Sequence, residues 1–156
     1  METAIRSSRV MMEKQEKVLI VEDMRSLATL LAAMIQDKWG IESDIAVSLE
    51  QTQQFLQEDA SHYFVAVVDL HLPDAPEGEA IDTVIQHKIP VLAFTGQYSE
   101  SLREDILSKG VVDYTLKQGQ GVEHVVNTVG RLHKNENTKV LVVDDSRVAR
   151  NAIVNT

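Results

Sequence analysis

The sequence predicts an α/β fold, a doubly wound five-stranded parallel sheet with helices on both faces. Short apolar runs typical of buried strands alternate with segments whose apolar residues recur at the spacing of a buried helix face. The alternation is strict and produces five strand-then-helix units over residues 17–134. The strongest run, Tyr63–Val68, is apolar throughout, which is typical of a strand that is buried on both sides of a sheet.

The first unit pairs a strand at Val18–Val21 with a helix that ends at Gly40. Two acids, Glu22 and Asp23, follow the strand directly. The next segment carries apolar residues at three- and four-residue spacing: Leu27, Leu30, Leu31, Met34 and Ile35. A glycine after such a stripe is typical of a helix C-terminus.

The second and third units follow the same plan. A weakly alternating strand at 41–47 precedes Ser48, which we expect to cap a helix. The strand Tyr63–Val68 then ends at Asp69, and a loop containing Pro73, Pro76 and Gly78 leads into a helix that ends near Lys88.

The last two units place a hydroxyl and an amine at strand ends. The strand 90–95 ends in Thr95 and is followed by a helix at 99–109. The strand 111–116 is followed by Lys117, and the final helix carries an apolar stripe: Val122, Val125, Val126, Val129 and Leu132. We therefore predict a flavodoxin-like sheet of order 2-1-3-4-5 rather than a six-stranded one.

Composition excludes several classes of function. The 156 residues are 44% hydrophobic and 25% charged, as in a soluble globular protein, and the net charge of −9 disfavours binding to nucleic acid or to anionic membranes. The absence of cysteine excludes disulfides, zinc–thiolate sites and thiol nucleophiles. Neither a membrane span nor a signal peptide is evident, so we expect a cytoplasmic protein.

An internal repeat suggests how the chain is divided. Lys17–Arg25 recurs as Lys139–Arg147, at an offset of 139 − 17 = 122 residues that matches the length of one domain. The second copy includes its own acidic pair, Asp144 and Asp145. We expect a flexible leader (1–16), one complete domain (17–134), a linker (135–138) and the truncated first strand and part of the first helix of a second domain (139–156).

Polar side chains lie at or just after the ends of four of the predicted strands. Because parallel strands end at one edge of the sheet, the acidic pair, Asp69, Thr95 and Lys117 should lie together. Each alone would be read as a turn or solvated residue, but their joint occurrence favours a functional site. With Tyr114, and with Pro73 four residues after Asp69, they resemble a response-regulator receiver domain, the phosphoacceptor half of a two-component system.

The resemblance implies that Asp69 is the phosphoacceptor and that Mg²⁺, or alternatively Mn²⁺, binds beside it. Asp23 and Asp69 would ligate the metal directly, Glu22 would act through water, and the backbone carbonyl of His71 would complete the set. This chemistry is reasonable in itself, because a carboxylate can hold a phosphoryl group as an acyl phosphate. Without metal, carboxylates so close repel, and at least one pKa should rise.

The resemblance also implies a switch. Lys117 and Thr95 would each contact a phosphoryl oxygen, and Tyr114 would move inward as Thr95 shifts. Two further positions, His71 and Gln97, would set the lifetime of the acyl phosphate, because in receivers they gate the attacking water.

The implied partners are a histidine kinase or histidine phosphotransfer protein and the downstream domains of the same chain. A homodimer through the face that follows Thr95 is a further arrangement to consider. A receiver is not itself an enzyme, but tandem receivers commonly precede a diguanylate cyclase domain, and the loop Leu72–Gly78 is similar to that group. The cognate kinase, the output and the oligomeric state are not readable from these residues.

Two departures from the family and three rival interpretations need testing. Gln118 stands where most receivers have a proline, so we expect a trans peptide or visible strain after Lys117. Gly78 lies nine residues after Asp69, where eight is common.

Two rival functions are disfavoured because a required residue is missing. A dehalogenase-type phosphatase would need an acid where His71 stands, and a dinucleotide-binding domain would need a glycine-rich turn after the first strand. A pseudo-receiver that works without phosphorylation is the alternative function.

Overall fold

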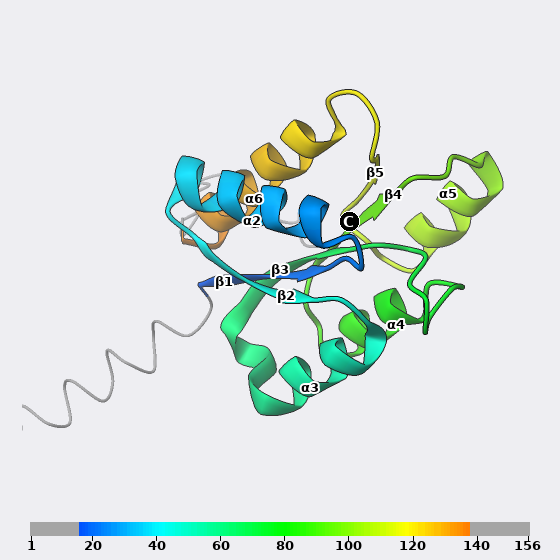
Figure 1. Cartoon of the computed structure of the whole chain (residues 1–156), viewed down its shortest axis with the longest axis horizontal. Helices are drawn as coiled ribbons and strands as arrows, with labels where there is room; N and C mark the ends of the chain where they lie inside the picture. The colour runs from blue at the N-terminus through cyan, green and yellow to red at the C-terminus, as the bar shows by residue number, and fades with distance from the viewer. Residues whose placement is uncertain (1–15, 138–156) are drawn as a thin grey trace, which may run out of the picture.

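The computed structural model describes residues 16–137, and the predicted strand-then-helix alternation is present throughout them (Figure 1). The strands, labelled as in Figure 1, are β1 (Lys17–Val21), β2 (Glu42–Ala46), β3 (Tyr63–Val68), β4 (Val91–Thr95) and β5 (Asp113–Leu116). The α-helices are α2 (Arg25–Trp39), α3 (Leu49–Asp59), α4 (Glu79–Gln86), α5 (Glu100–Ser108) and α6 (Gly121–Asn137), and a 3-10 helix, η1 (Ala60–His62), precedes β3. The strands pair in parallel in the order β2-β1-β3-β4-β5, which confirms the predicted fold.

The sheet is covered on both faces, and strands β1, β3 and β4 divide their side chains between two cores. In β1, Leu19 and Val21 pack toward α3, α4 and α5, whereas Val18 and Ile20 pack toward α2 and α6. Figure 1 shows α2 and α6 on one side of the sheet and α3 and α4 on the other. Every residue of β3 is buried, because this central strand has a helical layer over each face.

Two of the predicted helix ends are confirmed. Gly40 takes a left-handed conformation (φ 68°) and its N–H donates to the carbonyl of Gln36, which terminates α2. The hydroxyl of Ser48 accepts from the N–H of Gln51 at 3.1 Å and so caps α3.

Helix α6 extends three residues past residue 134, where the sequence predicts that the complete domain ends. The helix continues to Asn137, through most of the segment 135–138 that was expected to be a linker. No glycine or proline interrupts residues 131–137, so nothing in the local sequence stops the helix there. The predicted second copy at 139–156, including Asp144 and Asp145, lies outside the described residues, as does the leader before residue 16.

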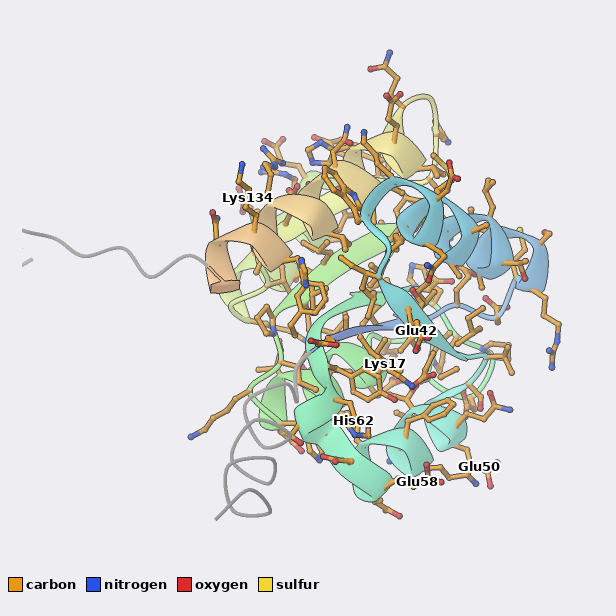
Figure 2. The ribbon with its side chains drawn as sticks, turned by 90° about the vertical axis from the view of Figure 1, so that its left-hand side faces the viewer. Lys17, Glu42, Glu50, Glu58, His62 and Lys134 are labelled. Atoms are coloured by element: carbon orange, nitrogen blue, oxygen red, sulfur yellow. The ribbon has the colours of Figure 1, made fainter. Side chains whose placement is uncertain are left out.

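Figure 2 shows the edge of the sheet at which the strands begin. Lys17 and Glu42 start β1 and β2 there, His62 directly precedes β3, and Lys134 lies near the end of α6. Both signs of charge are therefore present at this edge.

Among the helices of residues 16–137, none has the length and apolarity needed to cross a membrane.

Candidate functional site

The predicted acidic cluster forms where β1 and β3 end side by side. Val21 pairs with Val68 in the sheet, so Glu22 and Asp23 emerge next to Asp69. One carboxylate oxygen from each acid can be chosen so that the three atoms lie within 4.8 Å of one another. Glu22 and Asp69 are 2% and 5% exposed, whereas Asp23 is open to solvent.

Lys117 reaches this cluster from the far side of β4. Its Nζ lies 2.5 Å from Oε2 of Glu22 and 2.8 Å from Oδ2 of Asp69, so one amine forms ion pairs with both buried acids. The backbone N–H of Lys117 donates to the carbonyl of Thr95 at 2.8 Å, and this bond fixes the backbone position from which the side chain extends. Its Nζ also lies 5.9 Å from the centroid of the Phe94 ring.

Burial and the neighbouring charges have opposing effects on the pKa values of Glu22 and Lys117. Burial, with a smaller contribution from the charge of Asp69, raises the pKa of Glu22 to about 7 against the opposing effect of Lys117. Burial alone would lower the pKa of Lys117, but the hydrogen bonds to Asp69 and Glu22 outweigh it and raise that pKa. The expectation that one carboxyl pKa rises is met, although burial rather than repulsion is the main cause.

Thr95 and Tyr114 both form hydrogen bonds to the backbone of Gln97, in the segment after β4. Thr95 is fully buried, and its Oγ1 accepts from the N–H of Gln97 at 3.3 Å. The hydroxyl of Tyr114, which is 9% exposed, donates to the carbonyl of Gln97 at 2.8 Å. Burial, together with the nearby Tyr98, raises the pKa of Tyr114. The backbone of Gln97 therefore connects the hydroxyl of Thr95 to the ring of Tyr114, while its side chain is exposed.

His71 is held by its own loop rather than by the acidic cluster. Its backbone N–H donates to Oδ1 of Asp69 at 3.1 Å. Its ring Nδ1 lies 2.8 Å from the carbonyl of Pro76, so Nδ1 carries a proton and donates it to that oxygen. Among the described residues, the peptide bonds are all trans, including the one after Lys117, as expected where Gln118 replaces proline.

Sequence reasoning missed one residue of this neighbourhood, Asp74. Its carboxylate accepts from the N–H groups of Leu49 and Glu50 at the start of α3, at 2.9 and 3.1 Å. An aspartate after a proline predicts a turn, but a partner 25 residues earlier in the chain leaves no local pattern. The contact appears only once the sheet brings the two loops together.

The donor set fits a hard divalent cation. Three carboxylates against one ammonium group leave a net charge of −2 when all four groups are ionised. Carboxylate oxygens are the ligands that Mg²⁺ uses in proteins, and Asp23 is exposed at the edge where a cation can approach. The arrangement can therefore hold a divalent metal next to a buried carboxylate that is a potential nucleophile.

Comparison with known proteins gives a consistent result. A family model described as the response regulator receiver domain matches residues 18–128. The chain is 39% and 38% identical to two solved structures of two-component system response regulator/GGDEF domain proteins, each with a TM-score of 0.74, and the matches cover 88% and 90% of this chain. They cover 56% and 57% of those chains, so this chain spans a little over half of their length.

A more distant structure shares the fold. The receiver domain of the Francisella response regulator 1452 is 20% identical, with a TM-score of 0.68, and the match covers 79% of this chain and 100% of that one. Among curated proteins, the search finds no match.

Proposed function

Because the chain belongs to the response regulator receiver family, we propose that it takes a phosphoryl group onto Asp69 with Mg²⁺ bound beside it. The donor would be a histidine kinase or a histidine phosphotransfer protein, and the acyl phosphate would switch the output of a larger multidomain protein. The observation that carries the proposal is the position of Lys117, whose Nζ lies within 2.8 Å of both Glu22 and Asp69.

Each step of the transfer can be assigned to residues of this chain. A carboxylate oxygen of Asp69 attacks phosphorus and forms a C–O–P linkage, while the P–N bond to the donor imidazole breaks and that imidazole takes up a proton. Lys117 is within reach to pair with a phosphoryl oxygen, and the hydroxyl of Thr95 would contact another. Bound by Asp23, Asp69 and the carbonyl of His71, with Glu22 acting through water, Mg²⁺ would neutralise charge on the equatorial oxygens.

The switch would run from Thr95 to the surface beyond β4. If Thr95 moves toward a phosphoryl oxygen, its bond to Gln97 changes, and Gln97 holds the hydroxyl of Tyr114. Tyr98, which is 63% exposed, directly follows Gln97 and so adjoins this path, and α5 begins two residues later. We propose that this surface reports the phosphorylation state to downstream domains or to a second copy of the chain.

The lifetime of the acyl phosphate would depend on His71 and Gln97, which are bulky and polar. The backbone N–H of His71 contacts Asp69, and its ring is held by the carbonyl of Pro76. Replacing both residues by alanine should therefore shorten the half-life, because smaller side chains shield the linkage less from water.

A receiver domain is not itself catalytic, so the output belongs to the whole protein. Two of the matched structures are response regulator/GGDEF domain proteins. We propose that the protein that contains this receiver controls a diguanylate cyclase domain, the output that the family resemblance of the sequence implies.

The test is phosphorylation by a small donor. The wild-type protein is incubated with acetyl phosphate, with and without Mg²⁺, and its intact mass should rise by about 80 Da, the mass of one phosphoryl group, only when Mg²⁺ is present. The Asp69→Asn variant should not gain mass. If the wild-type mass stays unchanged while a control receiver is labelled, the protein is instead an interaction module that works without phosphorylation.

A further inference from the structure

One side chain pins the loop between β3 and α4 to the N-terminus of α3. Asp74 accepts the N–H of Leu49 through Oδ1 at 2.9 Å and the N–H of Glu50 through Oδ2 at 3.1 Å. These are the first two residues of α3, whose N–H groups have no partner within the helix. The bond from Leu49 and the bond from Glu50 lower the pKa of Asp74, so the carboxylate stays charged at the positive end of the helix dipole.

A tight turn places Asp74 in this position. Leu72 and Ala75 exchange both backbone hydrogen bonds, each at 3.1 Å, and both side chains are buried in the core on the α3 side of the sheet. Pro73 and Asp74 are the two central residues of this turn. The buried pair anchors the base of the turn, and Asp74 fixes its tip to the neighbouring helix.

The same turn is connected to Asp69 through His71. The backbone N–H of His71 donates to Oδ1 of Asp69 at 3.1 Å, and its Nδ1–H donates to the carbonyl of Pro76 at 2.8 Å. His71 therefore precedes the turn by one residue and also contacts the residue that follows it. A shift of the turn relative to α3 would move the backbone that faces Asp69.

We propose that Asp74 is a positioning residue that, by pinning the loop to α3, holds the backbone of His71 against Asp69. It thereby sets the metal affinity of the acidic cluster and the lifetime of the phosphoryl group. The inference rests on the proposed function, because it gives the loop a role in that same site. In this proposal α3 supports the site residues, although it supplies none of them itself.

A matched control is available on the same helix end. Ser48 also caps α3, through the N–H of Gln51, but it makes no contact with the β3–α4 loop in the described hydrogen bonds. Ser48→Ala and Asp74→Ala should therefore both weaken the start of α3, and urea unfolding checks that both variants still fold. Only Asp74→Ala releases the loop, and Asp74→Asn keeps one acceptor oxygen and should be intermediate.

The experiment has two readouts. Mg²⁺ is titrated into the ¹⁵N-labelled full chain while amide resonances are followed, and the decay of the acyl phosphate is followed by intact mass after acetyl phosphate is removed. We expect Asp74→Ala to bind Mg²⁺ roughly three- to tenfold more weakly, at or below the lower end of the loss seen when a group supporting metal ligands is removed. The acyl-phosphate half-life should change by a similar factor, and Ser48→Ala should match the wild type in both.

Each outcome is decisive. If Asp74→Ala and Ser48→Ala coincide in both readouts while the wild type binds Mg²⁺ and is phosphorylated, Asp74 is only a helix cap and the inference is wrong. If the wild type itself neither binds Mg²⁺ nor gains a phosphoryl group, the proposed function fails and this inference fails with it.

Discussion

Lys117 neutralises part of the negative charge of the site. It forms ion pairs with Glu22 and Asp69, both of which are almost completely buried, and its own side chain is 17% exposed. A buried ion pair contributes little net stability over an apolar replacement of both partners, but removing one partner leaves the other charge without compensation. Here a single removal would leave two buried carboxylates facing each other.

Replacing Lys117 by methionine should therefore destabilise the metal-free protein. We expect a loss of about 2–3 kcal/mol in the free energy of unfolding, somewhat less than for a fully buried pair because Lys117 retains some solvent contact. The measurement is urea unfolding in the presence of a chelator. The control is Lys109→Met, which breaks the more exposed pair with Asp82 and should cost about 1 kcal/mol or less. Equal losses for the two variants would contradict the compensating role of Lys117.

Tyr63 gives a prediction at alkaline pH. Burial first, and then the hydrogen bond to Asp44 at 2.7 Å, raise the pKa of this tyrosine above its usual value of about 10. The folded protein therefore keeps the proton at pH values where the unfolded chain has lost it. The resulting stability is fully present below about pH 10 and is lost as the pH rises further.

Tyr63→Phe should remove this pH dependence. The difference in free energy of unfolding between wild type and variant should be constant up to about pH 10 and should shrink above it. Urea unfolding between neutral pH and pH 11, with tyrosinate absorbance as a second probe, measures this. Tyr98→Phe, at a largely exposed position, should leave the alkaline loss unchanged. A parallel decline in wild type and Tyr63→Phe would show that Tyr63 ionises normally.

Among the elements, α2 and α6 are joined by a specific interlock on one face of the sheet. The indole N–H of Trp39, at the end of α2, donates to the carbonyl of Val126 in α6 at 2.9 Å. Lys38 donates from its amine to the side chain of Asn127. Gly130 leaves the space that the indole ring fills, because a Cβ there would lie 2.2 Å from a ring atom of Trp39.

Gly130→Ala should therefore destabilise the protein although alanine favours helix. We expect a loss of roughly 1–3 kcal/mol from the steric conflict, against a gain of at most about 1 kcal/mol from helix propensity. In a Trp39→Ala background the ring is gone, and the same change should become neutral or stabilising. Urea unfolding of the four proteins completes the cycle. A loss of the same size in both backgrounds would rule out the interlock.

The elements were largely predictable because their signals are local. The spacing of Leu27 to Ile35 gave α2, and Gly40 and Ser48 marked helix boundaries through conformational and capping preferences that depend only on neighbouring residues. The interlock of Trp39 with Gly130 and the cap that Asp74 provides were not predictable. Both contacts join residues that are far apart in the chain. The local sequence around either residue therefore carries no signal of its partner.

For the whole molecule, the candidate site was predictable because the topology itself brings strand ends together. Once the strands are parallel, residues at or just after the carboxyl ends of β1, β3, β4 and β5 must meet at one edge of the sheet. Two features of that edge needed the structure. The side chain of Lys117 lies between Glu22 and Asp69, and Glu22 rather than Asp23 is the buried member of the acidic pair. The burial of each acid depends on how the loop after β1 packs against its neighbours, and the order of residues in the chain does not specify this packing.

The proposed phosphorylation requires that this edge directs a phosphoryl group to Asp69 and not to Glu22 or Asp23. The most direct measurement is chemical mapping of the label. After incubation with acetyl phosphate and Mg²⁺, the protein is treated with borohydride, which reduces an acyl phosphate to an alcohol with release of phosphate, and is then digested for peptide mass spectrometry. We predict that the reduced side chain is found at Asp69, and that Asp69→Asn yields none. Reduction at Glu22, Asp23 or Asp74, or at no residue, would contradict the claim.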